Sequence, residues 1–175
     1  DRGKQFDDMY RTYRLPKKAG GFRIVTVPDR NLKRLQRRLL DAGFSNVPLS
    51  TATHGFRKKR SILTNAVPHV GKKMVCNVDI DSFFPNTKYD QILRACRCLA
   101  GGNISDRAAH FVADLCSYNG ALPTGAPTSP AISNIILSTI DEVLIKTTQR
   151  FGICYTRYAD DLTFSGHGDT HRILP

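Results

Sequence analysis

The sequence predicts an α+β fold in which helices pack on one face of a small antiparallel sheet. One observation is the order of the elements, because a single alternating strand precedes several amphipathic helical segments and a strand hairpin follows them. The other is that apolar residues, 41% of the chain, recur with helix and strand periods. A length of 175 residues is enough for one sizeable core.

The first third of the chain predicts a strand hairpin followed by a helix. Strands are expected over residues 13–15 and 22–27, joined by a loop that carries Lys17, Lys18 and two glycines. Asp29 is placed to cap a helix from 30 to about 41, whose apolar face holds Leu32, Leu35 and Leu39. Ser61, after the run Arg57-Lys58-Lys59-Arg60, is placed to cap a short helix that ends at Ala66.

The rest of the chain predicts a sheet that carries acidic residues at strand ends. Residues 74–79 alternate, with Met74, Cys76 and Val78 on one face, and Asp79 ends this strand. Helices are expected over 88–99 and 105–118. A third helix begins at Thr128 or Ser129, and its expected buried stripe is Ile132, Ile136, Ile140 and Val143. Strands over 153–158 and 162–164 flank Asp160-Asp161.

Charge divides the chain near residue 73. Residues 1–73 carry 18 Lys or Arg and 5 Asp or Glu, a net charge of +13, whereas residues 74–175 carry 8 and 10, a net charge of −2. A basic front half favours a polyanion such as nucleic acid, although a solvated basic face is the alternative. No apolar run approaches the roughly 20 residues of a membrane span, so a cytoplasmic protein without a membrane partner is expected.

Three carboxylates are the candidate chemical centre. Asp160-Asp161 alone is compatible with an ordinary solvated turn. Together with Asp79 at the mouth of another strand, the pair can supply three carboxylates to one polar sheet face, which suits two Mg²⁺ ions. Such ions favour in-line displacement at a triphosphate, so nucleotidyl transfer is the predicted reaction.

Five sequence boxes in this order make the chain resemble a bacterial reverse transcriptase over residues 13–165. They are Leu15-Pro16-Lys17 with Gly21-Phe22-Arg23, His54-Gly55-Phe56-Arg57, Asp79-Ile80-Asp81-Ser82-Phe83-Phe84-Pro85, Leu122-Pro123-Thr124-Gly125 with its continuation to Pro130, and Tyr158-Ala159-Asp160-Asp161. In addition, Asn65-Ala66-Val67-Pro68-His69 resembles the NAxxH element typical of retron enzymes. Group II intron and other prokaryotic relatives share the remaining boxes.

The resemblance implies a right-hand polymerase fold, with a basic fingers subdomain at residues 1–73 and a palm at 74–175 that lacks its primer grip and thumb. It implies catalytic and metal-binding roles for Asp79, Asp160 and Asp161, with the Ile80 carbonyl as a further ligand of two Mg²⁺ ions, or of Mn²⁺ as a substitute. The implied nucleotide-binding residues are Arg23, Lys17, Lys18, Phe84 and Thr124. Phe84 is the expected steric gate against a ribose 2′-hydroxyl, whereas an ordinary core aromatic is the alternative.

The implied nucleic-acid contacts are Arg57, Lys58, Lys59, Arg60, Asn65 and His69, and His69 is equally compatible with a packed histidine. The implied partners are a structured noncoding RNA as template and primer, dNTPs, nascent DNA and an effector protein in phage defence. Thr124 stands where the family usually has Gln, which puts normal substrate affinity in doubt. The alternatives are a noncatalytic RNA-binding module with this fold, and a template-independent or RNA-synthesising polymerase.

Overall fold

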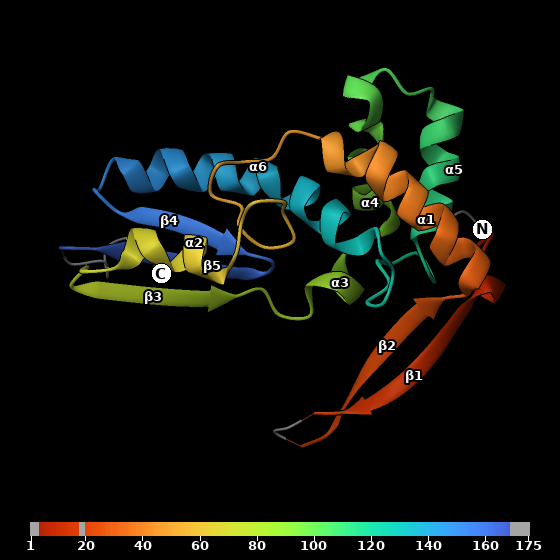
Figure 1. Cartoon of the computed structure of the whole chain (residues 1–175), viewed down its shortest axis with the longest axis horizontal. Coiled ribbons are helices and arrows are strands. Elements are labelled where there is room, and N and C mark those ends of the chain that lie inside the picture. The colour runs from red at the N-terminus through yellow and green to blue at the C-terminus, as the bar shows by residue number, and fades with distance from the viewer. Residues whose placement is uncertain (1–3, 18–19, 169–175) are drawn as a thin grey trace. The chain divides into compact units, whose positions relative to one another are not determined.

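The computed structural model describes residues 4–17 and 20–168, which form two compact units (Figure 1). The first, here called the hairpin unit, comprises Asp1–Val47 and Ser82–Ile136, and the second, the sheet unit, comprises Pro48–Asp81 and Leu137–Pro175. These units do not follow the border predicted near residue 73. The chain enters the sheet unit at Pro48 and leaves it after Asp81, so the change in charge falls inside a unit and not between two.

An antiparallel hairpin and a capped helix begin the hairpin unit. Strands β1 (Tyr10–Pro16) and β2 (Phe22–Pro28) pair over their whole length, from Tyr10 opposite Pro28 to Pro16 opposite Phe22. Helix α1 (Arg30–Ala42) follows, and the Asp29 carboxylate accepts a hydrogen bond from the Leu32 backbone N–H at 2.8 Å. This confirms the predicted cap, which satisfies one of the free donors of the first helical turn.

Besides α1, the hairpin unit contains the helices α3 (Phe83–Asn86), α4 (Tyr89–Arg97), α5 (Asp106–Cys116) and the first part of α6 (Ser129–Gln149). Tyr10 and Leu32 pack in a core with Leu115 and Ala126. The expected apolar face of α1 was wrong at one position, since Leu35 is 39% exposed and Gln36 is fully buried. Gln36 is accommodated because its amide nitrogen donates to the Leu115 carbonyl and the Tyr10 hydroxyl, both at 2.7 Å.

The sheet unit is built on a three-stranded antiparallel sheet with the order β3-β5-β4 (Figure 1). The strands are β3 (Met74–Asp79), β4 (Cys154–Tyr158) and β5 (Asp161–Gly166), and the predicted strand ranges agree closely with them. Helix α2 (Ile62–Ala66) contacts β4 and is capped by Ser61 as predicted.

Short 3-10 helices occur in both units. The hairpin unit contains η1 (Asp7–Met9), η2 (Phe44–Asn46) and η4 (Leu99–Gly102), and the sheet unit contains η3 (Val67–His69).

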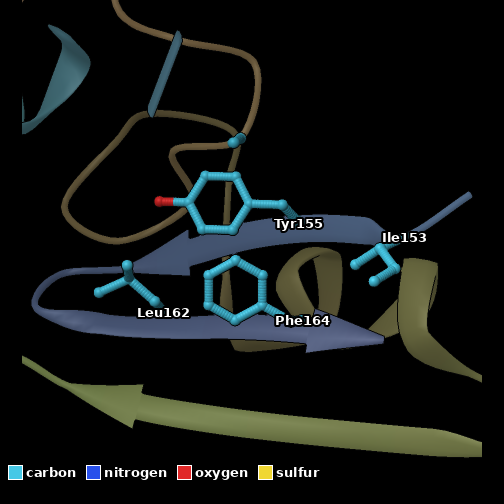
Figure 2. Packing of buried hydrophobic residues seen from close by; sticks show 5 residues of the cluster. Ile153, Tyr155, Leu162 and Phe164 are labelled. Atoms are coloured by element: carbon cyan, nitrogen blue, oxygen red, sulfur yellow. The ribbon is translucent and has the colours of Figure 1, made fainter. Parts of the chain in front are cut away.

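Apolar side chains from β4 and β5 form the core of the sheet unit. Figure 2 shows Ile153 and Tyr155 beside Leu162 and Phe164, and the rings of Tyr155 and Phe164 stack with their centroids 5.0 Å apart. Leu144 and Ile145 of α6 pack against this cluster, which places α6 on that face of the sheet.

The predicted stripe of α6 was wrong in its second half. Ile140 and Val143 are 46% and 60% exposed, whereas the charged Asp141 between them is fully buried. Asp141 is turned inward by hydrogen bonds from β4 side chains, including the Arg157 guanidinium. Among the described residues, no helix is long and apolar enough to cross a membrane.

Candidate active site

Two of the three carboxylates lie directly opposite each other on neighbouring strands of the sheet unit. Asp79, the last residue of β3, pairs with Asp161, the first residue of β5. Because side chains alternate along a strand, both carboxylates lie on the same face as Thr163, away from the core side chains Leu162 and Phe164. This face of the sheet is polar.

The third carboxylate belongs to the turn that joins β4 to β5. Tyr158 pairs with Asp161, so Ala159 and Asp160 alone form the turn. The Asp160 carbonyl accepts a hydrogen bond from the Ile80 N–H at 3.2 Å, which ties the turn to the end of β3. The backbones of the three predicted acidic residues and of Ile80 therefore lie next to one another, with Asp161 at the start of a strand and not in the turn itself.

The three carboxylates influence one another electrostatically. Burial raises the pKa of Asp161, and the negative charges of Asp160 and Asp79 raise it further. Within residues 4–17 and 20–168, no three His, Cys, Asp or Glu side chains are gathered closely enough to enclose a metal ion. Carboxylate and carbonyl oxygens are nevertheless the ligands that Mg²⁺ prefers, so this donor set suits a hard divalent cation.

The loop before α2, residues 48–61, packs against the turn formed by Ala159 and Asp160. The His54 N–H donates to the Arg157 carbonyl at 2.8 Å. A Cβ added to Gly55 would lie 2.3 Å from the Ala159 nitrogen, so no side chain fits at this position. The glycine of the His54-Gly55-Phe56-Arg57 box is thus required by close packing against the turn that carries Asp160.

The four basic residues Arg57-Lys58-Lys59-Arg60 of this loop differ in their burial. Arg57 is half-buried and donates to the Ser50 carbonyl at 2.8 Å, which holds the loop together. Lys58, Lys59 and Arg60 are exposed. Arg60 also lines an open cavity of about 540 Å³ in the sheet unit.

The two retron-type residues Asn65 and His69 contact side chains of β4 and β5. His69 is 7% exposed, and its ring nitrogens lie 2.6 Å from the Ser165 hydroxyl and 2.7 Å from the Thr156 hydroxyl. Burial, reinforced by the charge of Lys72, lowers the pKa of this imidazole. His69 is thus a packed histidine, which is one of its two predicted alternatives. The side-chain oxygen of Asn65 is buried without a hydrogen-bond partner among the described residues.

The predicted nucleotide-binding residues belong to the hairpin unit. Lys17 and Arg23 are exposed at the end of the β1–β2 hairpin where the connecting loop joins the two strands, and Lys18 lies outside the described residues. Phe84 is half-buried, as is Phe83, and their ring centroids are 6.2 Å apart. The Thr124 hydroxyl accepts from the Thr26 N–H at 3.0 Å and donates to the Ile24 carbonyl at 3.3 Å, so it fastens the Leu122–Gly125 segment to β2.

The sequence patterns did not predict two buried charged residues beside the turn formed by Ala159 and Asp160, here called the carboxylate turn. Arg157 of β4 and Asp141 of α6 are 1% and 0% exposed. A signal was present in the sequence, because Arg157 has the strand parity of the core residue Tyr155. A charged side chain at a core position needs a buried partner of opposite charge.

The fold defines a class of protein. The chain is similar in structure to telomerase from Candida albicans, with a TM-score of 0.56 and 9% sequence identity over 91% of this chain and 38% of that one. It therefore has a right-hand polymerase fold. Residues 15–173 match the family described as reverse transcriptase (RNA-dependent DNA polymerase), and the chain belongs to this family.

Sequence similarity to retron reverse transcriptases supports the predicted retron subtype. The chain is 38% identical to the retron Mx65 reverse transcriptase of Myxococcus xanthus and 35% identical to the retron Ec86 reverse transcriptase of Escherichia coli. These matches cover 90% and 91% of this chain, but only 40% and 49% of the relatives. The predicted resemblance to retron-type reverse transcriptases is confirmed, and the chain spans less than half the length of these two relatives.

Proposed function

We propose that the chain carries the nucleotidyl-transfer site of a retron-type, RNA-directed DNA polymerase. The reaction joins a dNTP to a primer 3′-hydroxyl on an RNA template and releases pyrophosphate. The observation that carries the proposal is the pairing of Asp79 with Asp161, next to Asp160, on one polar sheet face. Family membership supports the same reaction.

The proposed role of the three carboxylates is to bind divalent cations. Asp79, Asp160 and Asp161, with the Ile80 carbonyl, would hold Mg²⁺. When bound, such ions lower the pKa of an attacking hydroxyl and neutralise charge on the triphosphate. Burial raises the pKa of Asp161, and the negative charges of Asp160 and Asp79 raise it further. A bound cation removes the repulsion among these charges, so their clustering favours cation binding.

The hairpin unit supplies groups suited to the nucleotide. Arg23 and Lys17 are exposed cations, the kind of group that binds a triphosphate. Phe84 would exclude a ribose 2′-hydroxyl. Lys58, Lys59 and Arg60 suit phosphates of a structured RNA because they are exposed and adjacent.

Primer extension tests the proposal. The natural full-length protein should extend a primer on RNA with dNTPs and Mg²⁺. Asp160→Asn should abolish extension and retain RNA binding, whereas Asp41→Asn, at an exposed aspartate of α1, should leave both unchanged. Equal extension by the wild type and Asp160→Asn would refute the assignment.

The choice of sugar is tested separately. Phe84→Ala should raise NTP incorporation relative to dNTP incorporation, because the ring that occupies the 2′-hydroxyl position is removed. Phe83→Ala removes the neighbouring half-buried ring and is the matched control. An unchanged dNTP/NTP ratio in a folded Phe84→Ala protein rejects the gate role.

The retron subtype adds a biological role and partners. We place the protein with a structured noncoding RNA, its nascent DNA and an effector in defence against phage, on the strength of its similarity to retron reverse transcriptases. Phage plaque counts on cells carrying the wild-type retron or its Asp160→Asn form test this role. Equal counts would leave the polymerase without a part in defence.

A further inference from the structure

A fully buried ion pair lies directly beside the carboxylate turn. The Arg157 guanidinium contacts both carboxylate oxygens of Asp141, with Nε to Oδ1 at 2.8 Å and Nη2 to Oδ2 at 2.7 Å. The two side chains are 1% and 0% exposed. A bidentate pair is the arrangement in which Arg and a carboxylate interact most strongly. Burying two charges is nevertheless costly, and such pairs are often replaced by apolar residues without loss of stability.

Two hydroxyl groups also make hydrogen bonds with this pair. The Tyr155 hydroxyl donates to Asp141 Oδ1 at 2.6 Å. The Thr53 hydroxyl donates to Asp141 Oδ2 at 3.0 Å and accepts from Arg157 Nη2 at 3.0 Å. The pair thereby joins α6, β4 and the loop before α2 in one polar network. Such a network holds its members in a single arrangement when its hydrogen bonds are satisfied.

The remaining arm of the guanidinium reaches the turn itself. Arg157 Nη1 donates to the Ala159 carbonyl at 2.7 Å. Ala159 has a φ of 59°, in the left-handed region that a non-glycine residue adopts only at a cost. The conformation therefore needs support from its surroundings, and the carbonyl that Arg157 holds belongs to the peptide bond leading directly into Asp160.

The other side of Ala159 is closed by the loop before α2. Gly55 lies so close to the Ala159 nitrogen that an added Cβ would approach it to 2.3 Å. The Arg157 backbone is fixed to the same loop, since its N–H donates to the Ala52 carbonyl at 2.8 Å. The turn is thus held at its carbonyl by Arg157 and at its nitrogen by Gly55.

We propose that the Arg157–Asp141 pair is a positioning device that sets the Ala159–Asp160 turn, so that Asp160 and Asp161 project together as metal ligands. The inference rests on the proposed function and deepens it. Asp141 fixes the plane of the guanidinium, and the guanidinium in turn fixes the Ala159 carbonyl. An apolar pair of similar volume can fill the same space but cannot donate this hydrogen bond. A role in positioning therefore explains why charges are buried here, which a role in stability alone does not.

Arg157→Lys in the natural full-length protein is the direct test. A lysine keeps the positive charge, but its single ammonium group cannot span Asp141 and the Ala159 carbonyl in the fork geometry of arginine. The half-saturating Mg²⁺ concentration for primer extension should rise roughly tenfold or more, as for other groups that orient metal ligands. Mn²⁺ binding without nucleic acid, followed by electron paramagnetic resonance, should weaken by a similar factor. Arg97→Lys, in the exposed pair with Asp106, is the matched control and should change neither.

A second variant separates positioning from folding. The double variant Arg157→Met, Asp141→Leu replaces the pair by apolar side chains, so it leaves no unpaired buried charge while it removes the bond to Ala159. It should remain folded, with an unfolding temperature below that of the wild type because the buried Tyr155 and Thr53 hydroxyls lose their acceptor. Its half-saturating Mg²⁺ concentration should rise as in Arg157→Lys. Folded variants with wild-type Mg²⁺ and Mn²⁺ behaviour overturn the proposal. Failure of both variants to fold also overturns it, because the pair is then a stability element only.

The two proposals fail in different ways. A wild-type protein that extends no primer refutes the proposed function, and the Mn²⁺ measurement alone then decides whether Arg157 positions the carboxylates. A wild-type protein that extends primers, beside variants with unchanged metal dependence, refutes only the positioning role.

Discussion

Gly55→Ala should displace the turn that carries Asp160 with the smallest possible change in side chain. The new Cβ would lie 2.3 Å from the Ala159 nitrogen, 3.0 Å from the Tyr158 carbonyl carbon and 3.2 Å from the Ala159 Cα. Ordinary contact begins at 3.4 Å, so the backbone atoms must separate by roughly 1 Å. All three neighbours are backbone atoms, and no flexible side chain can yield in their place.

The expected effects follow from that displacement. Overpacking of this kind costs about 1 to 3 kcal/mol of stability. A shift of about 1 Å at a reacting centre costs on the order of 100-fold in rate. Primer extension at saturating dNTP and Mg²⁺ should therefore fall by about two orders of magnitude, at a temperature where urea unfolding shows the protein still folded.

A matched glycine controls for the substitution itself. Gly168 has no atom within 4 Å of an added Cβ and no positive φ, so Gly168→Ala should extend primers at the wild-type rate. A folded Gly55→Ala protein that extends primers as fast as Gly168→Ala would refute a displaced turn. Such a result would mean that the loop before α2 gives way without moving the turn.

Two further predictions concern stability. Burial and Lys72 lower the pKa of His69 from its ordinary 6.5, so the unfolded chain binds this proton at a higher pH than the folded chain. The stabilisation that the folded state gains from a neutral His69 is therefore fully present above about pH 6.5. It is lost as the pH falls below that value, by at most about 1.4 kcal/mol per pH unit. Urea unfolding at pH 7.5 and 5.5 should show a smaller loss in His69→Gln than in the wild type, and equal losses would contradict this. Asp29→Ala should cost about 1 kcal/mol because the cap on the Leu32 N–H is removed, and an unchanged unfolding midpoint would count against the cap.

Local signals in the sequence were sufficient for the secondary structure. Asp29 and Ser61 were predicted as helix caps, and each accepts a hydrogen bond from a backbone N–H of the first turn. Strand 74–79 was predicted with its observed limits. These features depend on neighbours within a few residues, which a sequence displays directly.

Burial patterns were less predictable where a polar side chain replaces an apolar one. Gln36 is buried in α1 in place of the expected Leu35, and Asp141 is buried in α6 between the exposed Ile140 and Val143. A hydrophobic period identifies a helix well. It cannot identify a polar residue whose partner lies on another element, because that partner is selected only when the elements pack.

The sequence by itself determined the reverse transcriptase family, the α+β class and the strand ends that carry Asp79, Asp160 and Asp161, because ordered motifs and period-two alternation are local properties. Only the tertiary structure decided how the carboxylate turn is held. Arg157 meets Asp141 across 16 residues and Thr53 across 104, and Gly55 fits against Ala159 with no room for a side chain. Such contacts form between elements that are distant in the chain, and their satisfied hydrogen bonds and close packing exist only after the elements have come together.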